Sequence, residues 1–451
     1  MTSDARPGRS LRVISPDSPL DHVTPYDRFA WSDEQIGLWL ASGERRRELL
    51  AYFGAAEYRA LAALARRAQR APVADAALRV LLVPGIMGSQ LGLLRPPPLP
   101  HDIVWLDPID IQLGRLATLR VPGAAHIVSL GVVPFSYLRL KLYLRAHGLA
   151  AEFHDYDWRL PVAQLGSALA ERVRAAGRTR VAIVAHSMGG LVARAALALA
   201  GTGNVERLVL LGTPHCGSFA AVQAVRGTYA VVRKVARLAG EASAESLAAE
   251  VFSTFPSLYD LLPVTAGGSG TDLFDARAWP ASGPQPRAAL MQAALAARQR
   301  LAPPDERFAS IVGVGQETVT AVTRRNDDFV YTLTRHGDGT VPATSAALVG
   351  VRSVYARVAH SNLTRDPVVA AAVVDMLRRG STTRLPAAWL SSSRACTRVS
   401  DRQLRRSHAQ KVDWAALTPE ERRVFLQNLN EPPQFKLRVP GAARRARRRL
   451  R

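Results

Sequence analysis

The segment around Ser187 has residue types that could form a nucleophilic site. It reads Ala-His-Ser-Met-Gly-Gly over Ala185–Gly190, follows the apolar run Val181–Ala185, and continues into a helical pattern that ends near Ala200. Small residues two positions before and after the serine let a strand and a helix cross closely, while the sharp turn between them exposes Oγ. The pattern therefore predicts a nucleophile elbow, with alanine at the first small position where glycine is usual. A serine that only caps a helix is the alternative.

A serine hydroxyl is a weak nucleophile unless a histidine takes its proton and a carboxylate orients that histidine. In the fold built around such an elbow, the chain order is serine, acid, histidine. Only His360 and His408 follow a plausible acid, and His408 lies in a strongly basic segment. His360 follows an apolar run, so a loop at the end of a strand would bring it over the sheet. We therefore predict His360 as the base.

The acid has to be chosen by its context, because several carboxylates precede His360. Asp338 lies in the glycine-flanked turn Gly337–Pro342, 22 residues before the histidine. Such a turn can hold a carboxylate rigidly in a loop. A glycine-flanked aspartate is often only a turn residue, but at this position the two interpretations agree, so we predict Asp338. The other acids include Asp260, Asp272, Asp275, Asp305, Asp327 and Asp328.

A tetrahedral intermediate on the serine would need backbone N–H donors for its oxyanion. Met188, which follows the nucleophile, supplies one donor in this kind of site, and the turn after the first strand supplies the other. That turn is Pro84–Ser89, where Ile86 is the favoured donor and Met87 the next. A simple turn that ends a strand remains the alternative.

Other reactive side chains in the chain receive structural interpretations. His186 precedes the nucleophile on the elbow and His215 follows a predicted strand, so both are expected to be structural. Cys216 has no base beside it in the sequence and is interpreted as a small buried residue. No group of histidines and carboxylates has the spacing of metal ligands, so we expect neither a metal nor a cofactor.

Short apolar runs predict the strands that position these residues. Runs rich in β-branched residues that end in turns are typical of buried parallel strands, and helical patterns alternate with them here. We therefore expect an α/β fold, that of the α/β-hydrolases, with a mostly parallel central sheet and helices on both faces. The predicted strands are Arg79–Val83, Val181–Ala185, Arg207–Leu211, Ile311–Val314 and Val351–Val358.

Two long insertions interrupt the predicted catalytic domain, residues 76–380. Plain connections in compact domains are shorter, so we interpret residues 91–150 as a cap and residues 217–301 as a lid. The lid includes the glycine-rich stretch 266–271, which suits a mobile element or a loose loop.

The two ends of the chain lie outside this pattern. Residues 1–75 are predicted as a helical arm and residues 381–451 as a basic C-terminal extension. The net charge is +22, and from Arg378 onward the chain has 19 Lys and Arg against 5 Asp and Glu, so most of the excess lies in the tail. The run Arg444–Arg451 suits peripheral contact with anionic lipid; nucleic acid is a less favoured partner.

The composition also bears on the compartment. The hydrophobic content of 48% and charged content of 21% are ordinary for a globular protein and exclude a wholly disordered chain. Neither a signal-peptide core nor an apolar stretch of about 18 residues is recognisable. Cys216 and Cys396 cannot form a disulfide framework. We expect a cytoplasmic protein whose membrane contact, if any, is peripheral, and the sequence leaves its oligomeric state open.

Several segments, in the same order, resemble the lecithin:cholesterol acyltransferase family, which includes lysosomal phospholipases and phospholipid:diacylglycerol acyltransferases. The resemblance extends over about Val80 to Leu377, and the Tyr-Asp-Trp-Arg-Leu segment is its most specific part. The matching segments are Val83–Leu91, Val104–Asp107, Tyr156–Leu160, the elbow, Gly337–Val341 and Ala359-His360.

The resemblance implies a triad of Ser187, Asp338 and His360, with oxyanion donors at Ile86 and Met188 and a lid after Gly217. It also implies transfer of an acyl group from a glycerolipid to water or to an alcohol. Ala185 departs from the family's elbow glycine, and the signal sequence and disulfides of secreted members are missing. These departures bear on the acceptor and the compartment.

Three functional hypotheses follow from the sequence. The first is a serine-dependent lipid acyl hydrolase or O-acyltransferase at a membrane surface. The second is a soluble carboxylesterase on non-lipid esters, which would prefer short chains and ignore vesicles. The third is a catalytically silent module that binds a partner or nucleic acid through its basic tail.

Overall fold

The computed structural model describes residues 26–73, 78–264, 271–390, 396–406 and 411–429. The run Arg444–Arg451, nearly all of the segment searched for a signal peptide, and most of the glycine-rich stretch 266–271 lie outside these ranges. Within them, none of the helices has the length and apolar character required to cross a membrane.

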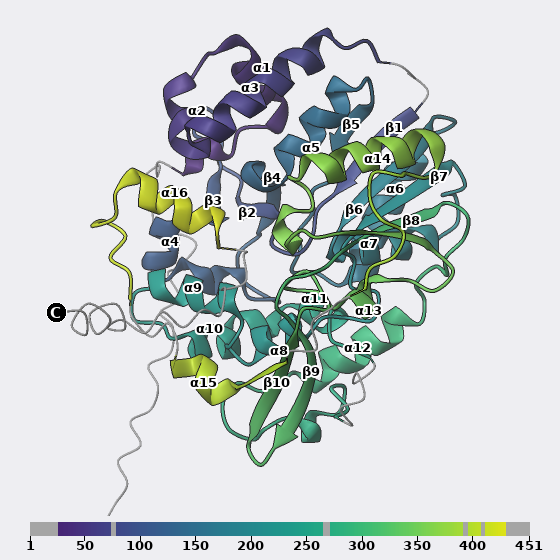
Figure 1. Ribbon diagram of the computed structural model, residues 1–451. Helices are drawn as coiled ribbons and strands as arrows, with labels where there is room; N and C mark the ends of the chain where they lie inside the picture. The colour runs from purple at the N-terminus through teal and green to yellow at the C-terminus, as the bar shows by residue number, and fades with distance from the viewer. Residues whose placement is uncertain (1–25, 74–77, 265–270, 391–395, 407–410, 430–451) are drawn as a thin grey trace, which may run out of the picture.

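A six-stranded sheet forms the centre of the molecule, and all of its neighbouring strands are parallel. The strand order is β11-β8-β7-β6-β1-β5, so the chain starts near one edge and builds outward in both directions (Figure 1). The strands are β1 (Leu78–Val83), β5 (Ala150–Phe153), β6 (Arg180–His186), β7 (Val205–Leu211), β8 (Phe308–Gly313) and β11 (Arg352–Ala356).

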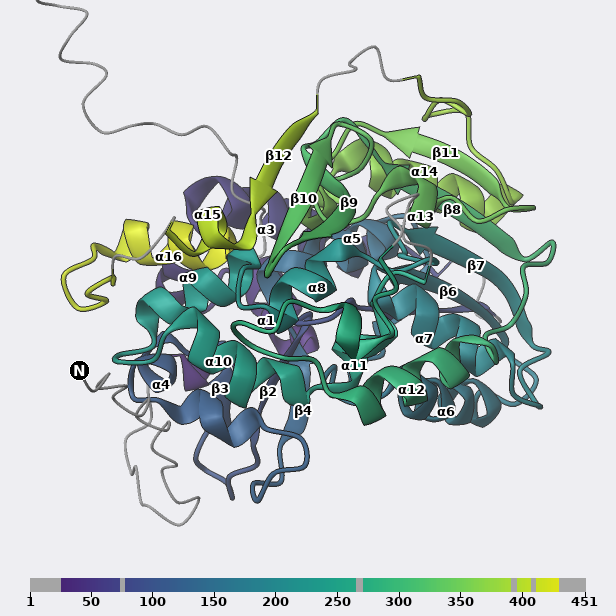
Figure 2. The ribbon, with the colours of Figure 1, turned by 90° about the horizontal axis from the view of Figure 1, so that it is seen from below.

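Side chains along the central strands alternate between two apolar clusters, as the twofold repeat of a strand requires. Leu81 and Ile183 face a cluster that includes α6 and α7, whereas Leu82 and Val184 face one that includes α5 and α14. Figure 2 shows α6 and α7 on one side of the strands and α14 on the other. The four covering helices are α5 (Pro134–Ala146), α6 (Val162–Ala175), α7 (Met188–Leu197) and α14 (Pro367–Arg379).

All five predicted strands are present in the sheet, and their ends differ from the prediction by at most three residues. The prediction missed β5, because its sequence Ala-Ala-Glu-Phe has no β-branched residue and resembles a helix as much as a strand. β5 lies at the sheet edge, where pairing with β1 through four residues is enough to fix it.

The N-terminal helices pack on the outside of α5. Ile36, Leu40 and Leu61 are buried in one apolar cluster with Leu138 and Leu142 of α5. The helices are α1 (Asp33–Ser42), α2 (Arg46–Phe53) and α3 (Ala55–Arg70), and a short 3-10 helix precedes them at Asp27–Phe29. They form a third layer over one face of the sheet (Figure 1).

The segment between β1 and β5 contains a small antiparallel sheet of order β3-β2-β4. It begins directly after the turn at Gly85, so its first strand extends the predicted oxyanion loop. Its elements are β2 (Ser89–Leu93), β3 (Asp102–Trp105), α4 (Pro108–Gln112), a 3-10 helix (Arg115–Leu119) and β4 (Val128–Val132).

The segment between β7 and β8 is mainly helical and covers the end of the sheet where Ser187 lies. Its helices are α8 (Phe219–Val225), α9 (Ala230–Leu238), α10 (Ala244–Glu250), α11 (Pro256–Asp260) and α12 (Ala288–Arg298), with 3-10 helices at Phe252–Thr254 and Ala276–Ala278.

The C-terminal extension completes a third sheet, of order β12-β10-β9, and then crosses the helices of the β7–β8 segment. Its last described helix packs beside α2 in Figure 1, where Gln427 donates to the backbone carbonyls of Tyr52 and Phe53. The strands of this sheet are β9 (Thr318–Arg325), β10 (Asp328–Thr334) and β12 (Thr397–Ser400). The helices of the extension are α15 (Asp401–Arg406) and α16 (Pro419–Gln427).

A buried ion pair fastens this extension to the helices over the sheet. Arg226, at the end of α8, and Asp401, at the start of α15, are both fully buried, and Nε of the arginine lies 2.8 Å from Oδ2 of the aspartate. Thr228 and Tyr331 donate their hydroxyls to the other carboxylate oxygen, at 3.1 and 2.7 Å. The two terminal guanidinium nitrogens donate three hydrogen bonds, to the backbone carbonyls of Pro280, Ser282 and Pro284.

We expect Asp401→Ala to lower the free energy of unfolding by about 3 to 5 kcal/mol, because it leaves the Arg226 charge buried without its partner. Chemical denaturation of both proteins measures the change. Asp413→Ala is the matched control, since Asp413 lies exposed in the same extension and only accepts the N–H of Ala415 in a turn, so its loss should cost about 1 kcal/mol. Equal stability of the two variants would show that the extension is not held by this pair.

Candidate active site

Ser187 occupies the sharp turn between β6 and α7. Its backbone has φ 56° and ψ −128°, a conformation that is uncommon for any residue with a side chain. Its N–H donates to the carbonyl of Leu211 on the neighbouring strand, at 2.9 Å, so the turn is fixed to the sheet. Ser187 is therefore held in a strained conformation at the end of β6.

Three glycines around Ser187 leave the space that this turn needs. A Cβ on Gly189 would lie 2.4 Å from the carbonyl oxygen of Pro84, and one on Gly190 would lie 2.0 Å from Oγ1 of Thr213. On the opposite loop, a Cβ on Gly85 would come within 2.7 Å of Cβ of Ser187. At the first small position of the motif, Ala185 is fully buried and fits.

The structure brings the predicted serine, histidine and aspartate into contact. Nε2 of His360 lies 2.9 Å from Oγ of Ser187, and Nδ1 lies 2.7 Å from Oδ2 of Asp338. His360 begins a short 3-10 helix, His360–Asn362, that follows β11. All three side chains are buried, and Asp338 is completely so.

The loop around Asp338 fixes its carboxylate toward His360. Oδ1 accepts the backbone N–H groups of Thr340 and Val341, at 3.0 and 2.7 Å, which leaves Oδ2 for the histidine. The carbonyl of Asp338 also accepts the N–H of His360 at 2.9 Å. A Cβ on Gly313 would lie 2.5 Å from Cβ of Asp338, so that glycine makes room for the acid.

This geometry defines where the protons lie at rest. A carboxylate only accepts hydrogen bonds, so Nδ1 of His360 carries the proton that faces Asp338. Nε2 is then free to accept the hydroxyl proton of Ser187. The arrangement can generate a nucleophilic alkoxide at Ser187 while the resulting imidazolium remains paired with a buried carboxylate.

The two predicted oxyanion donors lie at the ends of elements that meet at Ser187. Met188 is the first residue of α7, where backbone N–H groups have no partner within the helix. Among the described residues, the backbone hydrogen bonds include none from the N–H of Ile86 or of Met188. Met87, the second choice, has φ 60° and lines the cavity at Ser187. Both predicted N–H groups therefore remain available to a ligand.

Buried aromatic residues hold the loop Pro84–Ser89 in place. Nε1 of Trp105 donates to the carbonyl of Met87 at 3.4 Å, and Nε1 of Trp158 donates to that of Ser89 at 3.0 Å. The hydroxyl of Tyr156 donates to the carbonyl of Pro84. The Trp-Leu-Asp and Tyr-Asp-Trp-Arg-Leu segments thus contact the loop that faces Ser187.

Residues 165–280, which include the elbow and β7, match the family model described as the PGAP1-like alpha/beta domain. With the parallel sheet and the strand–serine–helix turn, this match decides the fold. The chain has the α/β-hydrolase fold. The predicted fold class is therefore confirmed, while the matching model is not that of the lecithin:cholesterol acyltransferase family. No curated protein sequence matches the chain.

The solved structures that match the chain are distant from it in sequence. A chain of the Tle4-Tli4 complex is 14% identical, with 69% of this chain and 99% of that chain covered and a TM-score of 0.47. Mature lipase BlEst2 from Bacillus licheniformis is 15% identical, with 69% and 96% covered and a TM-score of 0.35. Phospholipase PlaB from Legionella pneumophila is 11% identical, with 68% and 57% covered and a TM-score of 0.31.

The cavity beside Ser187 in this α/β-hydrolase is small and mainly apolar. Its volume is about 40 Å³, and the helices α8 and α11 cover it. The residues that line it include Met87, Ala221, Tyr229, Leu258 and Leu261. A space of this size holds only the first carbons of an acyl chain.

His215 and Cys216 lie away from the serine, near two arginines. Burial, together with Arg194 and Arg298, lowers the pKa of His215 to about 3, so this histidine is neutral and only weakly basic. Cys216 is partly exposed, contrary to its prediction as a buried residue, because it lies in the turn that precedes α8. Within the described ranges, no group of three or more His, Cys, Asp or Glu side chains is placed to hold a metal ion.

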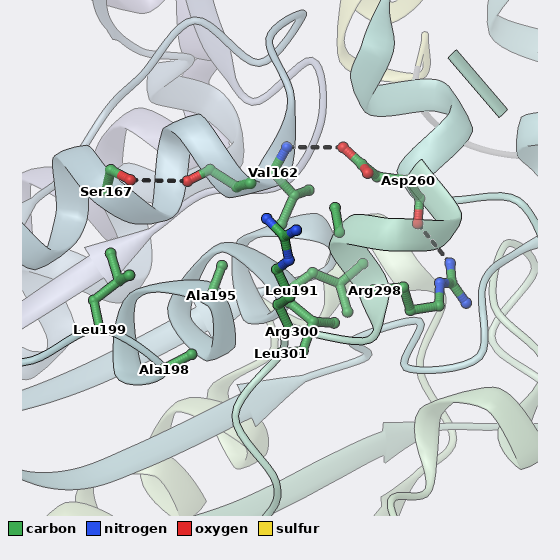
Figure 3. A pocket seen from close by; sticks show the side chains of 12 residues that line it. Val162, Ser167, Leu191, Ala195, Ala198, Leu199, Asp260, Arg298, Arg300 and Leu301 are labelled. Atoms are coloured by element: carbon green, nitrogen blue, oxygen red, sulfur yellow. Dashed lines mark hydrogen bonds between the residues drawn. The ribbon is translucent and has the colours of Figure 1, made fainter. Parts of the chain in front are cut away.

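A second cavity, of about 350 Å³, lies between α6, α7 and α12 and does not include Ser187. Figure 3 shows the carboxylate of Asp260 at its edge, where it accepts the N–H of Val162 at 2.8 Å, and Arg298 donating to the carbonyl of Asp260. Burial raises the pKa of the Asp260 carboxyl to about 6, against the opposing hydrogen bond from Val162. Burial therefore destabilises the ionised form of this carboxyl.

We expect Asp260→Asn to stabilise the protein at pH 8 and not at pH 4. The folded chain binds the proton of the Asp260 carboxyl more tightly than the unfolded chain does. The stability that this protonation contributes is therefore complete below about pH 4 and is lost as the pH rises through 6. The amide removes that loss, which is worth roughly 3 kcal/mol. Urea unfolding of both proteins at the two pH values measures it.

Asp275→Asn is the control, because Arg277 lowers the pKa of this partly exposed carboxylate. The Asp275 variant should gain no stability as the pH rises. If the advantage of Asp260→Asn does not grow with pH, the carboxyl is not destabilised by burial.

Proposed function

We propose that this protein is a serine-dependent lipid acyl hydrolase or O-acyltransferase that forms an acyl-Ser187 intermediate. The observation that carries the proposal is the continuous contact from Ser187 through His360 to Asp338. The apolar cavity beside Ser187 favours an acyl chain over a polar substrate.

In the proposed reaction, Oγ of Ser187 transfers its proton to Nε2 of His360 and attacks the acyl carbonyl carbon. The N–H groups of Ile86 and Met188 stabilise the negative oxygen of the tetrahedral intermediate. Its bond to the leaving alkoxide then breaks, and His360 returns the proton to that oxygen. Water or an alcohol next gives its proton to His360 and attacks the acyl-enzyme carbonyl carbon. The bond from that carbon to Oγ of Ser187 then breaks, and His360 returns the proton to Oγ.

The choice of acceptor rests on the resemblance to the lecithin:cholesterol acyltransferase family, whose members pass the acyl group to an alcohol or to water. The proposal that the enzyme works at a lipid surface rests on the basic tail, since each Lys or Arg near an anionic membrane contributes about 1 kcal/mol of binding free energy. In this proposal the protein is cytoplasmic and touches the membrane only peripherally.

The small cavity specifically favours a second candidate, a carboxylesterase on short non-lipid esters. Such an enzyme would use the same three residues and need no movement of α8 and α11. The catalytically silent module is less well supported, because a binding role alone gives no reason for a strained serine in contact with a buried histidine–aspartate pair.

We expect phospholipid vesicles incubated with the protein to yield lysolipid and free fatty acid, or an alkyl ester when a long-chain alcohol is added. Ser187→Ala should lower these products at least about 10³-fold, because it removes the nucleophile. Mass spectrometry of the extracted lipids measures them. Ser167→Ala, an exposed serine on α6, is the matched control and should retain full activity.

Hydrolysis of short esters without any lipid product would favour the esterase. Turnover that survives Ser187→Ala would reject both enzymatic proposals.

We expect the rate on dissolved esters to fall as the acyl chain lengthens, because the cavity at Ser187 has a volume of only about 40 Å³. The same long-chain esters presented in vesicles should be hydrolysed faster, since an apolar surface favours displacement of α8 and α11. Initial rates for a homologous series, measured with and without vesicles, test this. Equal rates for all chain lengths in solution would mean that α8 and α11 do not restrict access to the cavity.

A further inference from the structure

A chain of buried hydrogen bonds connects the two loops on either side of Ser187. The N–H of Gly85, in the oxyanion loop, donates to the hydroxyl of Tyr137 at 2.9 Å. That hydroxyl lies 3.0 Å from Nδ1 of His186, and Nε2 of the same ring lies 3.1 Å from the carbonyl oxygen of His360. Tyr137 and His186 are both buried, and neither touches Ser187 through its side chain in these contacts.

The direction of each bond follows from the groups at its ends. A carbonyl only accepts, so Nε2 of His186 carries the ring proton and donates to His360. Nδ1 of a neutral His186 then accepts the proton of Tyr137, whose oxygen in turn accepts the N–H of Gly85. Every hydrogen-bonding group along this chain is satisfied in one arrangement.

Electrostatics keep the arrangement fixed. Burial, followed by the nearby His360, lowers the pKa of His186 well below its usual range. Burial raises the pKa of the Tyr137 phenol, so that group keeps its proton. The rings of His186 and His360 are 4.7 Å apart, so a neutral His186 avoids repulsion when His360 becomes an imidazolium.

The Tyr137 hydroxyl packs closely against the oxyanion loop. A Cβ on Gly88 would lie 2.8 Å from the Tyr137 hydroxyl, which therefore sits inside the curve of the loop. The start of α5, which carries Tyr137, also accepts a bond on its other side, from the hydroxyl of Thr364 to the carbonyl of Ser136 at 2.7 Å. α5 thus contacts the segments that follow both Gly85 and His360.

We propose that Tyr137 and His186 are positioning residues that set the oxyanion loop and the His360 backbone relative to one another. The inference rests on the proposed function, because it assigns a purpose to that site. His186, interpreted from the sequence as structural, is in this view the link between the base and the oxyanion loop. Neither residue transfers a proton to substrate.

The first test is Tyr137→Phe, assayed on p-nitrophenyl butyrate. We expect kcat to fall about 10- to 100-fold with KM changed less than about twofold, since small displacements of catalytic groups act on the transition state. Tyr259→Phe is the matched control, because the Tyr259 hydroxyl also accepts a backbone N–H, from Arg287, and donates to a backbone carbonyl, that of Ser253. It should lose similar thermal stability and keep its kcat.

The second test compares His186→Gln with His186→Leu. The glutamine amide can still donate to the His360 carbonyl, so its kcat should exceed that of the leucine variant at least about fivefold. Wild-type kcat in Tyr137→Phe or in His186→Leu would overturn the proposal, as would equal losses in Tyr137→Phe and Tyr259→Phe. Ser187→Ala separates the two ideas: if it stays active, the proposed function fails, and if it is inactive while Tyr137→Phe is normal, only the positioning role fails.

Discussion

The positive φ of Ser187 is the constraint on which the rest of the site depends. That conformation places Oγ at the end of β6, beyond the sheet, but it also forces the start of α7 against the loop after β1. Gly189 and Gly190 are required because any side chain there would meet backbone or Thr213. The conformation is held by the hydrogen bond from Ser187 to β7 and by the buried core beneath it, so the sheet bears the strain of the turn.

The histidine and the acid must then reach a serine whose position is already fixed. Asp338 lies in the loop after β10, and His360 lies in the loop after β11. The hydrogen bond from the His360 N–H to the Asp338 carbonyl joins these two loops in addition to the contact between their side chains. The oxyanion loop is fixed differently, by aromatic residues of the β1–β5 segment and of the loop after β5. Each of these loops is therefore held by contacts that do not involve the side chains of Ser187, His360 or Asp338.

Much of this could be predicted from sequence where a local pattern carries the information. The apolar runs predicted five strands of the central sheet, and the elbow around Ser187 follows from small residues at fixed spacing. Asp338 and His360 were selected by chain order and turn context, and the structure brings them together. β5 was missed because its four residues have no strand-like composition, and only pairing with β1 makes them a strand. The prediction of a buried Cys216 is wrong, because a residue type does not report its exposure in a turn.

The contacts that sequence could not supply are those between side chains far apart in the chain. Nothing near Arg226 indicates Asp401, and nothing near His186 indicates Tyr137, because periodicity tells which face a residue occupies and not which partner it meets. A buried arginine or a buried tyrosine hydroxyl is stable only when its partner is present. A buried polar side chain in an apolar pattern therefore implies a partner elsewhere in the fold, and the partners of Tyr137 on α5 are Gly85 in the oxyanion loop and His186 beside Ser187.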